Sequence, residues 1–224
     1  MPVIIEPTNL ADLLKGEQEK RYSREALTIA MGESLVLGEV IGRRLLDIPT
    51  TGTADAGNTG NGAMTAVTGG QAAKRGVYTV ACITAATNGG TFQVRDPDGN
   101  LLQNAVLPGT SGGAVAYESE QINFTLTDAA TDFVVGDTFT VEIAKGDGVA
   151  VALDLAAVDG SQIAAGFPIA AYDATSAAVE GVAIVRDAII DADFLTWPAG
   201  ITADQKTAGL DQLAAKGIIS REAA

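Results

Sequence analysis

Apolar and polar residues alternate through the middle of the chain in a series of short runs. Because side chains on a β-strand point alternately to opposite faces, this period of two predicts strands with one buried face. The runs are residues 76–85 (GVYTVACITA), 90–96 (GTFQVRD), 101–107, 113–119, 121–126 and 137–144 (DTFTVEIA). Turn residues, such as Pro97-Asp98-Gly99-Asn100, separate them. Short strands with turns between them predict an all-β sandwich of immunoglobulin-like (Ig-like) architecture.

Apolar runs punctuated by glycine lie on either side of this block. In residues 26–50, Gly32, Gly38 and Gly42 separate apolar stretches, which predicts two or three short strands. After the block, apolar runs predict further strands at residues 150–155, 167–172 (FPIAAY), 181–185 and 188–190.

The last of these runs leads into an aromatic corner. It contains Phe194, Leu195 and Trp197 and ends at Pro198. The residue before a proline is pushed to an extended conformation, so we expect the indole of Trp197 to be held in a fixed direction. Packing in the core of the domain and packing near a subunit interface both fit this corner.

A polar helix is predicted after the corner, from about Thr202 to Lys216. Thr202 and Gln205 have the spacing of a capping box, and Gly217 is placed to end the helix. Gly209 inside the helix costs up to about 1 kcal/mol relative to alanine, so the helix is expected to depend on packing.

Two stretches are predicted to pack little. Residues 51–71 are rich in Gly, Thr, Asn and Ala, which is typical of a linker or a loosely held extended segment. Residues 1–25 begin with the apolar strip Val3-Ile4-Ile5, continue through a short helix expected at residues 10–14 with Thr8 or Asn9 as its cap, and end in a charged run. Such a segment has little to pack on by itself, and a frayed terminus is the simplest interpretation of it.

Charge and composition disfavour several classes of function. The chain carries 14 basic and 28 acidic residues, a net charge of −14, which opposes approach to nucleic acids and anionic membranes. It has no histidine, the residue used most often for proton transfer near neutral pH and the commonest metal ligand. Its single cysteine, Cys82, lies in a strand-like run and is expected to be a buried small apolar residue. With no signal peptide and no apolar run long enough for a membrane span, we expect synthesis in the cytoplasm.

Three motifs suggest chemistry, and each has a simpler structural interpretation. Ser111 in residues 109–113 matches a G-x-S-x-G nucleophile motif, but without histidine the usual triad cannot form, so a flexible hairpin is expected. Residues 96–100 (DPDGN) offer oxygen ligands for calcium, but they are also ideal turn residues. Asp187, Asp191 and Asp193 are expected to lie at a solvated edge or an inter-subunit contact. No catalytic, cofactor or metal site is therefore predicted.

Two parts of the chain resemble the head decoration proteins of tailed bacteriophages, the family of the phage lambda capsid-stabilising protein. The first is residues 26–43 (ALTIAMGESLVLGEVIGR). The second combines the strand at 181–185, the acidic stretch 187–193, the Leu-Thr-Trp-Pro corner, the polar helix and the Ile-rich end 217–220. The resemblance covers about half of the chain.

This resemblance implies a mainly β or α+β fold in which a small β-rich decoration domain with a C-terminal helix is interrupted by an Ig-like sandwich. The implied boundaries are an arm at 1–25, a decoration domain at 26–50 and 149–224, and an insertion at 51–148. It also implies a structural virion protein, made in the host cytoplasm and placed on the outer capsid surface. Its partners would be the major capsid protein, through Val3, Ile4 and Ile5, and further copies of itself in a homotrimer.

A second hypothesis makes the inserted sandwich an adhesin for host-surface glycans. Aromatic rings exposed on one face of the insertion would favour glycan binding, and a wholly polar outer surface would count against it. The aromatic residues in question are Tyr78, Phe92, Tyr117, Phe124, Phe133 and Phe139.

Overall fold

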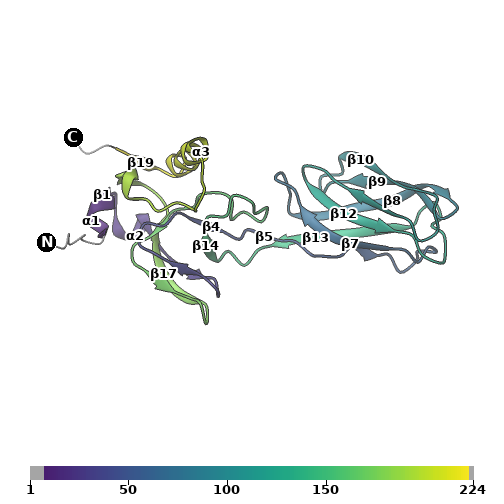
Figure 1. Cartoon of the computed structure of the whole chain (residues 1–224), viewed down its shortest axis with the longest axis horizontal. Coiled ribbons are helices and arrows are strands. Elements are labelled where there is room, and N and C mark those ends of the chain that lie inside the picture. Colours follow the sequence, from purple (N-terminus) through teal and green to yellow (C-terminus); the bar gives the residue numbers. More distant parts are fainter. Residues whose placement is uncertain (1–7, 222–224) are drawn as a thin grey trace. The chain divides into compact units, whose positions relative to one another are not determined.

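The computed structural model describes residues 8–221, and its chain forms two compact units (Figure 1). The inserted unit is the continuous segment Leu46–Gly146, and the split unit contains the residues before and after it. Strands dominate both units, and one longer helix lies near the C-terminus. The predicted mainly β class with a C-terminal helix is confirmed.

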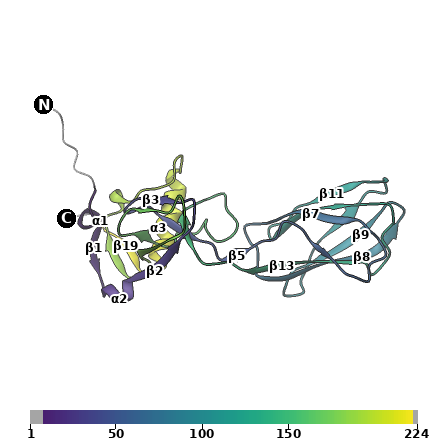
Figure 2. The same cartoon turned by 90° about the horizontal axis from the view of Figure 1, so that it is seen from below.

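The inserted unit is built from antiparallel strands in two sheets. A six-stranded sheet has the order β10-β9-β8-β13-β5, with β6 also paired to β13, and a three-stranded sheet has the order β11-β12-β7. In Figure 2, β7 and β11 lie in one layer and β8 and β9 in the other. The strands are β5 Leu46–Asp47, β6 Thr53–Ala54, β7 Ala63–Gly69, β8 Gly76–Ala86, β9 Gly89–Arg95, β10 Leu101–Leu107, β11 Ala114–Tyr117, β12 Ile122–Thr127 and β13 Thr138–Lys145.

Alternate residues of these strands meet in a single core. In β12, Ile122, Phe124 and Leu126 are buried while the residues between them are partly exposed. The core is rich in aromatic contacts, such as the edge-to-face pair Phe92 and Phe133, whose ring centroids lie 5.0 Å apart. The strands predicted between residues 76 and 144 are confirmed. The prediction succeeds because the period-two pattern marks the residues that face this core.

The prediction of a linker at residues 51–71 is wrong for its second half, which contains β7. β7 pairs along its length with β12, and its side chains Met64 and Val67 are buried in the core. The pattern was hidden because small residues occupy the outer face, and because Ala66, at a φ of 50°, interrupts the alternation where the register shifts.

The split unit joins segments from both sides of the insertion. Its five-stranded sheet has the order β15-β17-β2-β14-β4, and two smaller sheets, β1-β18-β19 and β16-β3, lie beside it. The elements before the insertion are α1 Leu10–Leu13, β1 Leu14–Glu17, α2 Lys20–Ser23, β2 Arg24–Ile29, β3 Ser34–Leu35 and β4 Ile41–Arg43. Those after it are β14 Ala150–Ala152, β15 Phe167–Pro168, β16 Tyr172–Asp173, β17 Val179–Ile184, β18 Ala188–Ile190, the 3-10 helix η1 Ala192–Phe194, α3 Ala203–Ala214 and β19 Ile218–Ser220.

The described part of the predicted arm, residues 8–25, is integrated into the split unit. Leu13 is fully buried in its core, and β1 pairs with β18. The short helix is confirmed as α1, with Asn9 and Asp12 forming a capping box. The expectation that this segment has little to pack on is therefore wrong for residues 8–25; Val3, Ile4 and Ile5 lie outside the described residues.

Residues 167–172 do not form the single strand expected from their apolar run. Phe167 and Pro168 pair with β17, whereas Tyr172 and Asp173 pair with β3 in a different sheet. Proline has no N–H to donate to a continuing ladder, which is consistent with a strand that ends at Pro168.

The C-terminal helix is confirmed as α3. The Thr202 hydroxyl accepts the Gln205 N–H at 3.2 Å, and the Gln205 side chain accepts the Thr202 N–H at 2.9 Å. These two bonds satisfy donors that an uncapped helix leaves free. Leu213 is fully buried in the core of the split unit.

The two ends of the insertion are paired with each other. Within the split unit, the Gly148 N–H donates to the Arg44 carbonyl at 2.8 Å, and the Arg44 N–H donates to the Val149 carbonyl at 3.1 Å. Within the inserted unit, Leu46 pairs with Lys145. The insertion therefore starts and finishes at neighbouring points of its host.

We expect Gly62→Ala to destabilise the inserted unit by about 1–3 kcal/mol, the usual cost of overpacking. A Cβ at this position would lie 2.3 Å from the Phe133 ring and 2.3 Å from the Thr127 carbonyl oxygen. Urea unfolding followed by tyrosine near-UV circular dichroism measures the loss. Gly57→Ala is the control, because its Cβ would meet only the Asp55 side chain, at 3.1 Å. Equal stability of the two variants would contradict the packing of this segment.

Candidate functional site

The corner that follows β18 is held in place by backbone hydrogen bonds. The Asp191 side chain caps η1, and Leu195, 7% exposed, is buried in the core. The Thr196 carbonyl accepts the Val40 N–H, and the Thr196 N–H donates to the Gly38 carbonyl, both at 2.9 Å. The corner is therefore fixed to the segment that precedes β4.

Trp197 packs against α3 at Gly209. A Cβ at position 209 would lie only 2.6 Å from the indole ring, so glycine is what lets the ring and the helix approach. This contact gives the physical reason for a glycine inside the helix. Trp197 and its neighbour Pro198 are both partly buried.

Phe194 is the most exposed of the four corner residues, at 38%. The Lys15 ammonium lies 5.6 Å from the centroid of its ring, in a cation–π arrangement. The structure thus brings all four predicted residues into one corner, with Leu195 in the core and the Phe194 ring partly open to solvent.

The three aspartates around the corner do not form a catalytic pair. Asp187 has a φ of 42°, and its carbonyl accepts the Ser23 hydroxyl at 2.9 Å. The Asp191 carboxylate accepts the Asp193 N–H, while Asp193 itself is exposed. Within residues 8–221, no group of His, Cys, Asp or Glu is arranged to hold a metal ion.

The turn considered as a calcium loop already has a cation, the ammonium group of Lys74. Asp96, whose side chain is 1% exposed, accepts the Lys74 ammonium at 2.8 Å and the Asn100 N–H at 2.8 Å. The Lys74 hydrogen bond, with further ones from Asn100 and Gln121 and against the effect of burial, holds the Asp96 pKa well below its usual range. Local sequence does not mark Lys74 as the partner of this turn, because Lys74 lies 22 residues from Asp96 along the chain.

Ser111 lies in an exposed turn between β10 and β11, closed by the Gly113 N–H donating to the Thr110 carbonyl. Within residues 8–221 no side chain is hydrogen-bonded to its hydroxyl, and the nucleophile motif therefore has no base. Cys82 is buried as expected, and burial raises the pKa of its thiol.

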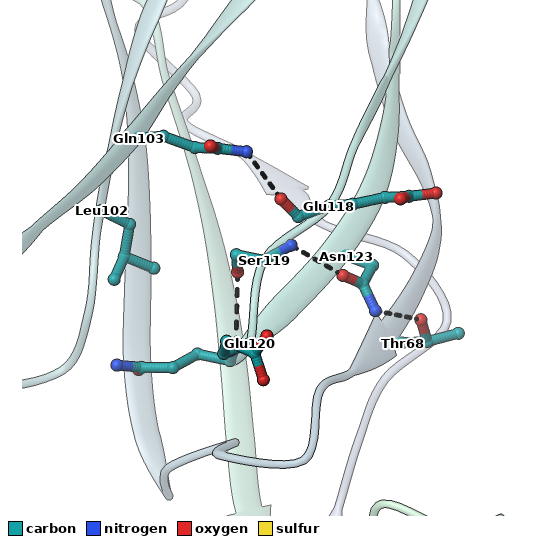
Figure 3. A pocket seen from close by; sticks show the side chains of 8 residues that line it. Thr68, Leu102, Gln103, Glu118, Ser119, Glu120 and Asn123 are labelled. Carbon is teal, nitrogen blue, oxygen red and sulfur yellow. Dashed lines mark hydrogen bonds between the residues drawn. The ribbon is translucent and has the colours of Figure 1, made fainter.

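The inserted unit has an open polar hollow of about 790 Å³ beside the turn between β11 and β12 (Figure 3). The Gln103 amide donates to the Glu118 carbonyl at 2.6 Å, and the Ser119 N–H donates to the Asn123 side chain at 2.9 Å. The lining residues are Thr68, Leu102, Gln103, Glu118, Ser119, Glu120, Gln121 and Asn123. Much of the polar lining is thus occupied by the unit's own hydrogen bonds.

No aromatic ring lines this hollow. The aromatic residues considered for glycan stacking are all buried, at 0–3% exposure: Tyr78, Phe92, Tyr117, Phe124, Phe133 and Phe139. Their rings form the core and offer no exposed stacking surface.

A comparison with protein families decides the identity. The model for the bacteriophage lambda head decoration protein D family matches residues 3–218. The chain belongs to this family. The match spans both parts of the split unit and the inserted unit between them.

Head decoration proteins are structural components of the phage virion, and the corner, turn and hairpin above contain no assembled catalytic group. This decoration protein has no helix in residues 8–221 long and apolar enough to cross a membrane. No curated protein matches the chain.

Two crystal structures of Xanthomonas campestris FlgL share 20% sequence identity with this decoration protein, at a TM-score of 0.31. The matches cover 51% and 53% of this chain and 34% and 33% of the FlgL chains. The chain thus spans about a third of the length of these proteins.

We expect Lys74→Met to destabilise the inserted unit near neutral pH, because it leaves the buried Asp96 carboxylate without its cation. The lowered pKa of Asp96 means that its contribution is present above the unfolded value of about 3.9 and is lost as the pH falls below it. The difference between variant and wild type should therefore shrink in strong acid. Thermal unfolding from pH 7 to pH 2 measures this difference in stability, and Lys145→Met is the control of equal charge. If the difference between Lys74→Met and wild type stayed constant over this pH range, the ion pair would be contradicted.

We expect Gly209→Ala to destabilise the split unit by about 1–3 kcal/mol, because the new methyl group would overlap the Trp197 ring. Helix propensity alone predicts the opposite sign, a gain of about 1 kcal/mol. Urea unfolding, followed by the fluorescence of the single tryptophan, distinguishes destabilisation by the ring overlap from stabilisation by helix propensity. A more stable variant would show that the ring does not pack on the helix.

Proposed function

We propose that the protein binds the assembled phage head as a homotrimer at three-fold positions and stabilises the shell. The observation that carries this proposal is the match of the decoration family across residues 3–218, which includes both parts of the split unit. The major capsid protein is then the partner, and the outer surface of the virion is the location.

The stabilisation follows from mass action. A protein that binds only the assembled shell shifts the equilibrium toward that shell, and many copies acting together multiply the effect of weak individual contacts. Such a role requires a rigid protein and no reactive group. The capped helix, the clamped corner and the fully buried core side chains support this role.

The proposal divides the contacts between two parts of the split unit. Val3, Ile4 and Ile5 form the capsid contact, because extended apolar segments add readily to the strands of a partner. Phe194 is the corner residue with the surface to meet another subunit, while Leu195, Trp197 and Pro198 hold the corner in place. The inserted unit projects outward from the head.

Glycan binding by the inserted unit receives no support from its aromatic side chains. Sugar sites commonly use exposed rings as stacking surfaces, and the rings of this unit are in its core. The open polar hollow has no ring to supply that contact.

The full chain is expected to co-sediment with expanded, undecorated heads and not with dissociated capsid subunits, and to raise the temperature at which the heads break. Replacing Val3, Ile4 and Ile5 with serine should weaken head binding by about tenfold or more, since a few apolar anchors dominate many interfaces. Replacing the exposed Met31, Val36 and Ile163 with serine is the matched control.

Light scattering should give the mass of three copies. Failure of the wild-type chain to co-sediment would remove the proposal. An equal effect of both triple variants would remove the capsid contact assigned to Val3, Ile4 and Ile5.

A further inference from the structure

A charged hollow closes one end of the apolar core under the main sheet of the split unit. On β2, Leu27 and Ile29 are buried, and Glu25 continues their row because residues two apart share a face. On β4, Arg43 continues the row of the buried Ile41 in the same way. Glu25, Arg43, Arg186 and Lys216 line this hollow of about 320 Å³.

Two arginines share the single carboxylate. Glu25 accepts one hydrogen bond from Arg43, at 3.0 Å, and one from Arg186. The Arg186 guanidinium also donates to the Tyr22 carbonyl at 2.7 Å and lies 5.5 Å from the centroid of the Tyr22 ring. The Arg43 Nε donates to the Gly148 carbonyl at 3.1 Å. Both guanidinium groups are therefore held in position, so a ligand would not have to order them.

Positive charge exceeds negative charge in the hollow. Arg43, Arg186 and Lys216 supply three cations against the one carboxylate of Glu25. The Lys216 ammonium has no hydrogen bond or ion pair with any residue of the described range 8–221. Each guanidinium has five N–H donors, and the bonds above use only two on each.

We propose that this hollow binds a side-chain carboxylate of a protein partner. A carboxylate fits the fork of donors on a guanidinium and would offset the excess positive charge. A polyanion such as a nucleic acid is disfavoured by the net charge of −14 and by Glu25 within the hollow. The carboxylate comes from a capsid subunit or from a second copy of this chain.

Titration with sodium acetate, and separately with inorganic phosphate, tests the anion site without any partner. At fixed ionic strength, acetate should shift the NMR signals of the Arg43 and Arg186 Nε–H groups in a saturable way. Lys216→Glu should weaken this binding by about tenfold, whereas Lys206→Glu, an equal charge change on α3, should leave it unchanged. Both lysines are exposed, and Trp197 fluorescence checks that both variants fold. No saturable shift, or an equal effect of the two variants, would overturn the anion site.

The same two variants test whether the carboxylate comes from a capsid subunit or from a second copy. This assignment rests on the proposed function. Loss of head co-sedimentation by Lys216→Glu alone identifies a capsid carboxylate, and loss of self-association alone identifies a second copy. If neither changes relative to Lys206→Glu, the hollow has no protein partner and the proposal is wrong. Failure of the wild-type chain to bind heads is a separate result, which rejects the decoration proposal and leaves the acetate titration to decide the anion site.

Discussion

The split unit depends on the pairing of β2 with β17, two strands that the insertion separates along the chain. Their register runs from Ile29 opposite Val179 to Arg24 opposite Ile184. Gly181 lies in this ladder at a close contact, because a Cβ there would lie 2.6 Å from the end of the Ile29 side chain and 3.2 Å from the Tyr172 ring. Since closure entropy grows only slowly with loop length, a folded insertion adds little to the cost of bringing these strands together. The paired ends of the insertion, at Arg44 and Gly148, reduce that cost further.

The parts of the fold that could be predicted are those in which a local residue pattern has a single structural explanation. Alternating large side chains marked the strands of the inserted unit, and Thr202 with Gln205 marked the start of α3. Local sequence fails to predict an element where tertiary contacts decide its structure. β7 has few large residues of its own and becomes a strand because β12 and the core accept Met64 and Val67.

The candidate sites show the same limit. The turn at Asp96 was expected from its residues, but its partner Lys74 could not be found from local sequence because a long-range contact places it. From the sequence alone, Gly209 only lowers the expected stability of the helix. The structure shows that glycine is what lets the Trp197 ring pack against the helix. The charged hollow combines Glu25 and Arg43 with two cations from beyond the insertion, so no local motif marks it.

The buried carboxylate of Asp137 has a structural role in the inserted unit. Burial opposes ionisation of Asp137, but N–H donors from Thr59, Val134 and Gly60 lower its pKa and so keep the carboxylate charged. These bonds fix the loops that contain Thr59, Gly60 and Val134 to the core of the inserted unit.

Electron cryomicroscopy of undecorated phage heads mixed with the purified chain tests most directly whether the protein decorates the shell. Three copies of the split unit at each three-fold position are the expected result. If heads mixed with an excess of the protein carry no added density at their three-fold positions, the claim that the protein decorates the shell is contradicted.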